Sequence, residues 1–172
     1  MMVGMSDRTT GMGGHQSAAM KKDEWLTPPE IIGALGGFDL DPCAPVVRPW
    51  ATAREHYTIE DDGLGQEWSG RVWLNPPYGK HTGVWLSKLA VHGDGIALIF
   101  ARTETKMFRE HVWGKADAVL FLIGRLFFCH VTGQQAKHNA GAPSCLVAYG
   151  GRNVDALATS GVPGVLVREW AL

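Results

Sequence analysis

The run GIALIF, residues 95–100, is apolar throughout. A strand with apolar residues at every position is buried on both faces, which is typical of the centre of a parallel sheet. Apolar runs at 72–74, 118–122 and 144–149 predict further buried strands. Because helical stretches lie between these strands, the sequence predicts an α/β fold with a mostly parallel central sheet flanked by helices.

The helices are predicted from their apolar spacing and their end signals. Residues 82–91 are expected to form a helix that turns Val84, Trp85 and Leu89 inward. The segment Thr27-Pro28-Pro29-Glu30 predicts another helix, with Thr27 as its N-cap and Pro28 at its first position, ending at Gly36-Gly37. Further elements are expected at 38–41 (strand), 103–113 (helix), 154–159 (helix) and 165–167 (strand).

The chain length and charge limit the possible organisation. The 172 residues allow one domain, expected at 23–172, after a leader at 1–22 that has no periodicity and is predicted to be disordered. The net charge of −1 excludes a chain-wide electrostatic grip on nucleic acid, so any positive surface must be local. Candidates for it are Lys21, Lys22, Lys80, His81, Arg102, Lys106 and Arg109.

Cysteine and histidine usage argues against a disulfide framework and a metal site. The three cysteines lack CxxC spacing and are odd in number, which predicts a reducing cytoplasm. The seven histidines are scattered without the spacing of metal ligands, so no metal is expected. No apolar run reaches the roughly 18 residues of a membrane helix.

The tetrapeptide Asn75-Pro76-Pro77-Tyr78 directly follows the strand predicted at 72–74. The side-chain oxygen of Asn75 can accept one hydrogen of a planar amine, and the carbonyl of Pro76 can accept the other. Two acceptors draw the NH₂ group toward tetrahedral geometry and direct its lone pair at an electrophile. The ring of Tyr78 offers a face for an extruded base. The tetrapeptide could also be a rigid turn and nothing more.

Two acidic segments are expected at the same edge of the sheet, because ligands of open parallel sheets bind beyond the carboxyl ends of the strands. The segment 39–44 places carboxylates at a strand end, where they can accept from an ammonium group or ribose hydroxyls. Asp61 and Asp62 can accept from an adenine amino group, with Leu64 packed on the ring. Either segment alone could be a turn, but together they suit a cationic sulfonium cofactor.

An ordered series of motifs runs along the chain. Its pieces are Asp23-Glu24-Trp25, Thr27-Pro28, the segments 38–44 and 61–64, Trp68, the segment 73–79, Trp85 with Lys88, Gly124-Arg125 with Phe127 or Phe128, and Pro143-Ser144. This series resembles the phage and prophage family of S-adenosylmethionine-dependent DNA N-6-adenine methyltransferases (Dam-like). The resemblance covers about residues 23–150 and implies a Rossmann-like methyltransferase fold with S-adenosylmethionine as cofactor and DNA as partner.

The resemblance also implies roles for single residues. Asn75, Pro76, Pro77 and Tyr78 are expected to be the catalytic residues. Cofactor contacts are expected from Trp25, Thr27, Pro28, Asp39, Asp41, Pro42, Cys43, Ala44, Asp61, Asp62, Gly63, Leu64 and Asn75. The start of the helix at Thr27-Pro28 would suit the cofactor's carboxylate, and Cys43 is expected to pack against the cofactor rather than act as a nucleophile.

The chain departs from the wider methyltransferase pattern in its first half. A glycine-rich turn is absent after the first strand, and residues 44–61 are too irregular to predict a full crossover helix, so an abbreviated first half is expected. No segment remains for a separate target-recognition domain. Substrate contacts are therefore expected from short loops, through Lys80, His81, Arg125, Lys137 and His138.

The predicted function is methylation of adenine at N-6 in DNA, with protection of phage DNA from restriction as the role that the resemblance suggests. A protein glutamine N-methyltransferase is an alternative, because a glutamine amide is also a planar NH₂ group. A non-catalytic nucleic-acid-binding relative is a second alternative. Cofactor binding would separate both enzymes from the non-catalytic relative.

Overall fold

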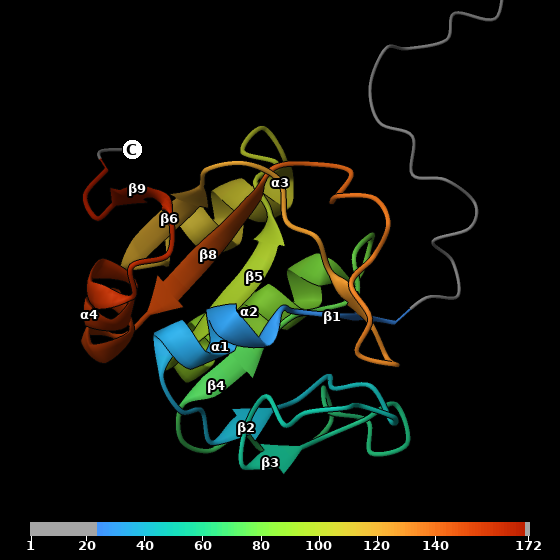
Figure 1. Ribbon diagram of the computed structural model, residues 1–172. Helices are drawn as coiled ribbons and strands as arrows, with labels where there is room; N and C mark the ends of the chain where they lie inside the picture. Colours follow the sequence, from blue (N-terminus) through green and yellow to red (C-terminus); the bar gives the residue numbers. More distant parts are fainter. Residues whose placement is uncertain (1–23, 171–172) are drawn as a thin grey trace, which may run out of the picture.

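The computed structural model describes residues 24–170 and shows a central sheet with helices on both faces (Figure 1). The predicted leader at 1–22, which includes Lys21 and Lys22, lies outside the described residues, as does Asp23. The described part of the chain contains no helix that is long and apolar enough to span a membrane.

The main sheet has seven strands in the order β3-β2-β4-β5-β8-β6-β9. Strands β3, β2, β4 and β5 are parallel neighbours, whereas β8 is antiparallel to both β5 and β6, and β9 is antiparallel to β6. The strands are β2 (Leu40–Asp41), β3 (Glu55–His56), β4 (Val72–Leu74), β5 (Gly95–Phe100), β6 (Ala118–Leu122), β8 (Ser144–Tyr149) and β9 (Gly164–Val167).

The sheet is therefore mixed, although most of its strands run in one direction. The reversal at β8 follows from its connection: the described residues 123–143 contain no helix that could carry the chain back across the sheet. The chain therefore stays at the edge of the sheet where β6 ends, so β8 starts at that edge and runs antiparallel to β6. A small second sheet pairs β1 (Trp25–Leu26) with β7 (Cys129–His130) in antiparallel fashion.

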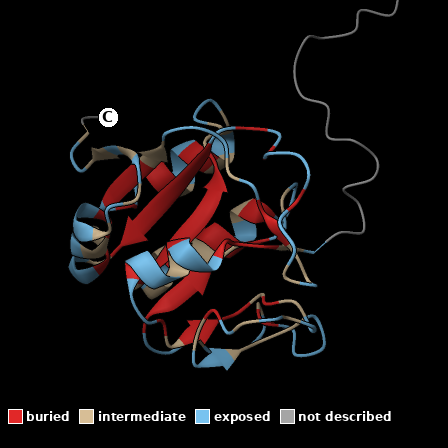
Figure 2. Cartoon of the chain, in the orientation of Figure 1, coloured by how far each residue is buried: buried red, intermediate tan, exposed pale blue. Residues whose placement is uncertain are grey.

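The helices pack on the two faces through separate apolar clusters. Ile31 and Leu35 of α1 (Pro29–Leu35) and Leu157 of α4 (Gly151–Thr159) cover one face of the sheet. The other face is covered by α2 (Thr82–His92) and by α3 (Lys106–Phe108), which continues as a π-helical segment, η2 (Arg109–Trp113). Figure 2 shows the buried strands between these helices.

Three details of the helices predicted after Thr27 and at 82–91 were wrong. Thr27 does not cap α1, and Pro28 is not its first residue: Pro28 is the N-cap, Pro29 is the first residue, and no side-chain hydrogen bond caps this helix. Val84 is 52% exposed, because the buried stripe of α2 runs through Thr82, Trp85, Leu86 and Leu89. Val84 lies outside that stripe, as the 3.6-residue period requires.

The first half of the sheet is as abbreviated as the sequence predicted. No helix lies between β2 and β3 or between β3 and β4 in the described structure. Strand β2 pairs with β4 at Leu40 and Val72 only, whereas β5 and β8 pair from Gly95–Tyr149 to Phe100–Ser144. Main-chain bonds therefore hold the residues around β2 mainly against β3, for example from the Ala44 N–H to the Tyr57 carbonyl at 2.9 Å, and much less against β4.

Candidate active site

The ends of β2 and β4 bring two of the predicted motifs to the same edge of the sheet. Asp41 is the last residue of β2, and Asn75 directly follows β4. Because these neighbouring strands are parallel, their carboxyl ends meet at one edge. The segments 41–44 and 75–78 therefore lie next to each other, as the sequence predicted.

Asn75 takes part in three hydrogen bonds, with Trp25, Cys43 and Tyr78. Its side-chain Nδ2 donates to the main-chain oxygen of Trp25 at 3.0 Å. Its main-chain oxygen accepts from the Cys43 thiol at 3.3 Å. Its Oδ1 accepts from the Tyr78 hydroxyl at 3.5 Å, a long and weak contact. Because the Trp25 carbonyl can only accept, it fixes the amide with Nδ2 toward β1 and Oδ1 toward Tyr78.

The loop after Asn75 is closed by Thr82 at the start of α2. The Thr82 hydroxyl donates to the Pro77 carbonyl at 2.8 Å and accepts from the Gly79 N–H at 3.0 Å. Pro76 is buried, and no hydrogen bond within the described residues engages its carbonyl. That carbonyl and Asn75 Oδ1 are the acceptors that the sequence assigned to a target amine.

Tyr78 is half-buried, and one face of its ring is covered. It stacks on Phe100 with ring centroids 4.1 Å apart and an interplanar angle of 18°. Phe128 meets it edge-on at 6.1 Å. Burial raises the pKa of Tyr78 far above its usual value, so the phenol stays protonated. A base could therefore stack only on the face away from Phe100.

Asp41 is 3% exposed, and both of its carboxylate oxygens have partners. The Thr52 hydroxyl donates to Oδ2 at 2.5 Å, and the Cys43 N–H donates to Oδ1 at 3.2 Å. Burial raises the pKa of Asp41 from 3.8 to about 6, although both hydrogen bonds and Arg48 oppose the shift. Asp41 is still mostly ionised at neutral pH, and it organises the loop around it.

The two neighbouring aspartates at 61 and 62 have different environments. The Asp61 carboxylate accepts from the N–H and the hydroxyl of Thr58, at 2.8 and 2.9 Å, and closes a turn. Asp62 is exposed, has a φ of 51°, and makes no hydrogen bond or ion pair through its carboxylate within the described residues. Both oxygens of Asp62 are therefore free to accept from a ligand, whereas Oδ2 of Asp61 is engaged in the turn.

Gly63 connects this turn to the end of β2. A Cβ at Gly63 would lie 1.9 Å from the carbonyl oxygen of Pro42, so no larger residue fits at this approach. Leu64 is half-buried, and its carbonyl accepts from Lys88 Nζ at 2.7 Å. The structure thus brings the segment 61–64 against 42–44, in agreement with the predicted grouping. Ala44 is buried in the same region.

Unpaired polar groups lie beside the site. The indole N–H of Trp25 and the hydroxyls of Thr27 and Ser144 are buried and have no hydrogen-bond partner within the described residues. Trp25 contacts Asn75 through its carbonyl, and Ser144 pairs across the sheet with Phe100. Buried polar groups without partners are costly, so such groups suit a site that a ligand completes.

The start of α1 offers few main-chain donors for an anion. Pro28 and Pro29 have no N–H, and the N–H of Ile31 donates to the Pro28 carbonyl at 3.1 Å. The sequence predicted that this helix start would suit the cofactor's carboxylate, but what the structure offers at Thr27 is a buried hydroxyl without a partner among the described residues.

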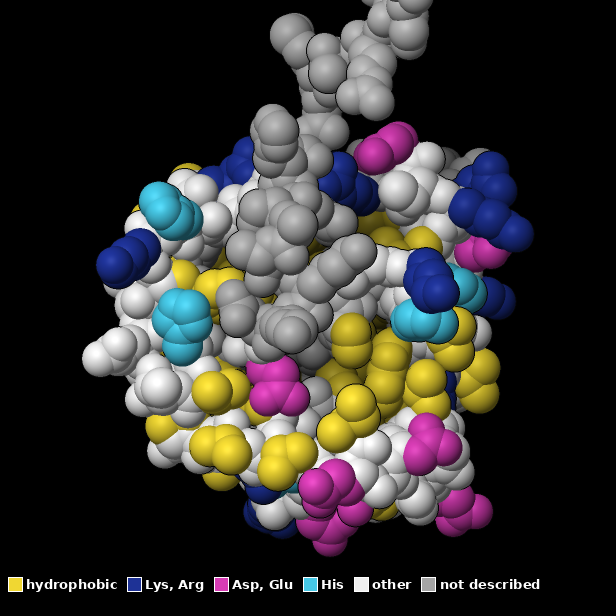
Figure 3. Space-filling model, turned by 90° about the vertical axis from the view of Figure 1, so that its right-hand side faces the viewer, with side chains coloured by type: hydrophobic (Ala, Val, Ile, Leu, Met, Phe, Trp, Pro, Cys, Tyr) yellow, Lys and Arg dark blue, Asp and Glu magenta, His cyan; other side chains and the backbone are white. Residues whose placement is uncertain are grey.

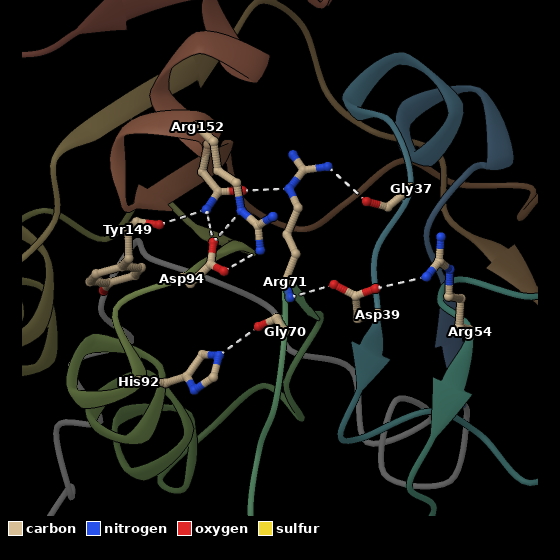
Figure 4. Close-up of polar contacts among 10 residues, drawn as sticks. Gly37, Asp39, Arg54, Gly70, Arg71, His92, Asp94, Tyr149 and Arg152 are labelled. Carbon is tan, nitrogen blue, oxygen red and sulfur yellow. Dashed lines mark hydrogen bonds and ion pairs between the residues drawn. The ribbon is translucent and has the colours of Figure 1, made fainter.

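Asp39 lies at the opposite edge of the sheet (Figure 4). Its carboxylate accepts from the Arg71 N–H at 2.8 Å and pairs with Arg54 at 3.5 Å. The Arg71 side chain in turn donates to Asn153 at 2.7 Å and to the Gly37 carbonyl at 2.9 Å. Because Arg71 precedes β4, this network is at the amino edge, and the structure does not bring Asp39 together with the other predicted cofactor residues.

The predicted substrate-contacting residues are all exposed: Lys80, His81, Arg125, Lys137 and His138. Arg125 also has a structural contact, because its Nη1 donates to the Ala140 carbonyl at 3.1 Å and ties the loop at 132–142 to the end of β6. Figure 3 shows a face with hydrophobic side chains near its centre, Lys and Arg mainly in its upper half, and Asp and Glu mainly in its lower half.

The sequence did not predict the contacts of three residues that support the site; of these, Lys88 had been named only as part of the motif series. Thr52 binds Asp41, Phe100 supports Tyr78, and Lys88 donates to the carbonyls of Leu64 and Gln66. The apolar run could have indicated Phe100, because it ends at the predicted edge. Nothing in the irregular segment around Thr52 marks it. Within residues 24–170, no group of three or more His, Cys, Asp or Glu side chains could hold a metal.

The fold and the strand-end asparagine define an α/β protein with a polar site at the carboxyl edge of its sheet. A family model described as DNA N-6-adenine-methyltransferase (Dam) matches residues 14–156. The chain therefore belongs to this family, which confirms the resemblance. Searches of curated proteins and of solved structures found no match.

Proposed function

We propose that this chain transfers a methyl group from S-adenosylmethionine to N-6 of adenine in DNA, using a Rossmann-like methyltransferase fold. The observation that carries the proposal is the orientation of Asn75 at the end of β4. Its Nδ2 is committed to Trp25, so its Oδ1 is presented as an acceptor beside Tyr78. Family membership supports the same reaction.

The residues at this edge fit S-adenosylmethionine, which when bound supplies an electrophilic methyl group on a sulfonium. Asp62 would accept from the adenine amino group of the cofactor, and Leu64 would pack on its ring. The Asp41 carboxylate places negative charge near the cationic centre, an attraction that burial strengthens. The unpaired Trp25 N–H and Thr27 hydroxyl suit the polar amino-acid end.

The target amine would be bound by acceptors rather than deprotonated by a strong base. Asn75 Oδ1 and the Pro76 carbonyl accept its two hydrogens and turn its lone pair toward the methyl group. The Tyr78 hydroxyl is a weak partner for Asn75 at 3.5 Å and is displaced at little cost by the amine. The proton released afterwards passes to water.

Adenine can reach this site only after it leaves the duplex. The flipped base would stack on the free face of Tyr78, since Phe100 covers the other. Exposed Lys80, His81, Arg125, Lys137 and His138 would contact the phosphates and neighbouring bases. With a net charge of −1, affinity should be weak and should fall steeply with salt. Protection of phage DNA from restriction is the proposed biological role.

The experiment that tests this function measures methyl incorporation directly. Purified protein is incubated with isotopically labelled S-adenosylmethionine and duplex DNA, and the nucleosides are then separated and identified. Label in N-6-methyladenine supports the proposal. Label in a glutamine of a partner protein, with none in DNA, would show the alternative amide substrate. Cofactor binding without transfer to either substrate would indicate the non-catalytic relative.

A further inference from the structure

We propose that Cys43 is a positioning residue, whose thiol holds the main chain of Asn75 and thereby sets the separation between the cofactor loop and the target-amine loop. This inference rests on the proposed function. It assigns Cys43 a different task from packing against the cofactor. The observation behind it is the bond from Cys43 Sγ to the Asn75 carbonyl oxygen at 3.3 Å.

Main-chain pairing does not set this separation. Strand β2 pairs with β4 only at Leu40 and Val72, before either loop begins. The next residue of β2, Asp41, pairs with His56 of β3 and has no partner in β4. Among the described residues, the Cys43–Asn75 bond is the hydrogen bond that joins the segment 41–44 to the segment 75–78.

The Cys43 donor is itself fixed by a chain of buried contacts. Its N–H donates to Asp41 Oδ1 at 3.2 Å, while the Thr52 hydroxyl donates to Oδ2 of the same carboxylate at 2.5 Å. The loop that carries Thr52 is held by His56, since His56 Nε2 accepts from the N–H groups of Thr52 and Ala53 at 3.2 and 3.3 Å. Residue 43 therefore has a defined main-chain position from which its thiol reaches Asn75.

The chemical state of the thiol suits this task. Burial, with a further contribution from the Asp41 carboxylate, raises the pKa of Cys43 well above its usual value. The group stays a protonated thiol that can donate to a carbonyl, whereas a thiolate would repel it. A thiol in this state is a poor nucleophile, so Cys43 is not expected to form a covalent intermediate.

A single thiol donor contributes little to the free energy of folding. Its effect on kcat can be larger, because it helps to position the residue that binds the target amine. Methyl transfer requires the amine, the methyl carbon and the sulfur to be aligned, and small misplacements of reacting groups are costly. We expect loss of the Cys43 donor to lower kcat about tenfold, a fraction of the roughly hundredfold cost of a 1 Å misplacement.

Three variants separate hydrogen bonding from packing. Cys43→Ser keeps a donor, Cys43→Ala removes it and leaves space, and Cys43→Val removes it while filling the space. Cys145→Ala is the matched control for loss of a buried thiol, because Cys145 in β8 makes no side-chain hydrogen bond to either loop within the described residues. The measurements are kcat on DNA, calorimetric Kd for S-adenosylmethionine, and hydrogen exchange of the peptide covering residues 75–80 without any ligand.

The expected result is that Cys43→Ala and Cys43→Val lose kcat and exchange faster at 75–80, with the cofactor Kd within about twofold of the wild type, a change near 0.4 kcal/mol. Cys43→Ser should keep both properties, and Cys145→Ala should change neither. A weakened cofactor Kd with unchanged kcat, or unchanged exchange at 75–80 in both donor-free variants, overturns the inference. If the wild type methylates no DNA, the proposed function fails while the exchange measurement still decides the role of Cys43.

Discussion

Strands β5 and β8 pair from end to end with fully buried residues, whereas β2 pairs with β4 at one position and with β3 at two. The difference lies in what fixes each region. The second half of the sheet is fixed by long main-chain ladders. The first half has short ladders, with main-chain bonds such as Tyr57 N–H to the Asp41 carbonyl and Ala44 N–H to the Tyr57 carbonyl, and side chains such as Asp41, Thr52 and Cys43 add to them. Both halves contribute residues to the two apolar clusters. The candidate active site lies where these two regions meet.

The two regions are therefore expected to differ in what they affect: the well-paired strands mainly the stability of the fold, and the loops around β2 mainly ligand binding. Side-chain bonds define the loops around β2 without making them part of the main ladder, so they can open locally at less cost than global unfolding. Ligand-binding segments are commonly found in such regions. Substitutions in β5 should therefore affect the whole fold, and substitutions around β2 should affect binding and local order first.

The largest effect on stability is expected in the well-paired half. Leu98 is fully buried in β5, so Leu98→Ala should lower the free energy of unfolding by about 2–5 kcal/mol through lost burial and a cavity. Val165 of β9 is 60% exposed, and Val165→Ala should stay within about 0.5 kcal/mol. Denaturant unfolding measures both. Equal losses at the two positions would contradict the contrast between paired core and edge.

The next effect concerns the buried carboxylate of the first half. The folded pKa of Asp41 is about 6 against 3.8 in its ordinary state, so between these pH values the folded protein holds a proton that the unfolded chain has released. The contribution of Asp41 to stability is thus present below about pH 4 and is lost as the pH rises through about 6, by about 3 kcal/mol in total.

Asp41→Asn tests this pH dependence, because the amide does not titrate. The free energy of unfolding of the variant, relative to the wild type, should rise by about 3 kcal/mol between pH 4 and pH 7. Denaturant unfolding of both proteins across that range measures the difference. A difference that stays constant with pH would show that Asp41 titrates normally and that its burial is not maintained in solution.

The third effect is on chemistry. Asn75→Ala removes one acceptor for the target amine and should lower turnover by roughly 10²-fold, with the cofactor Kd little changed. Asn75→Asp keeps acceptors but loses the donor to the Trp25 carbonyl, so it should lose about tenfold through poor orientation. Steady-state rates on DNA measure both. Full activity in Asn75→Ala would overturn the proposed role of the strand-end asparagine.

The sequence predicted where the strands of the well-paired half lie, but not their directions, because β8 is antiparallel to β5 and β6, and β9 is antiparallel to β6. The runs at 72–74, 95–100, 118–122 and 144–149 are strands with those bounds, since a continuous apolar run has few alternatives to a buried strand. The helix predicted at 82–91 is α2, and only its inward face was partly wrong. The tetrapeptide at 75–78 was placed correctly because it follows one of these strands directly.

The first half could be predicted only in outline. Strands β1, β3 and β7 have two residues each, which is too short for any periodicity to mark them. Asp39 and Asp41 are two residues apart, yet one joins the network at the amino edge and the other lies at the site. Strand β2 has only two residues, so Asp39 precedes it and Asp41 ends it, and no pattern in the sequence marks so short a strand.

The fourth effect distinguishes the two aspartates of the turn at 61–62. Asp62→Ala should weaken S-adenosylmethionine binding by about 1.5–3 kcal/mol, the value of a hydrogen bond to a charged group. Asp61→Ala is the matched control: it should disturb the turn through Thr58 but weaken binding less. Calorimetry with each variant measures the two affinities. A larger loss in Asp61→Ala would show that the loop geometry, and not the Asp62 carboxylate, determines binding.

The smallest effect is expected at Tyr78, where the two regions touch through its stack on Phe100 of β5. Tyr78→Ala should cost about 1–3 kcal/mol of base stacking in kcat/KM on DNA, while Tyr78→Phe keeps the ring and should be mild. A mispaired adenine should react at least as well as a paired one, because unpairing costs a few kcal/mol. Since Tyr78→Ala also leaves a space beside Phe100, unfolding must be measured in parallel. If Tyr78→Ala loses stability but keeps kcat/KM, Tyr78 supports the sheet edge and does not stack on the substrate.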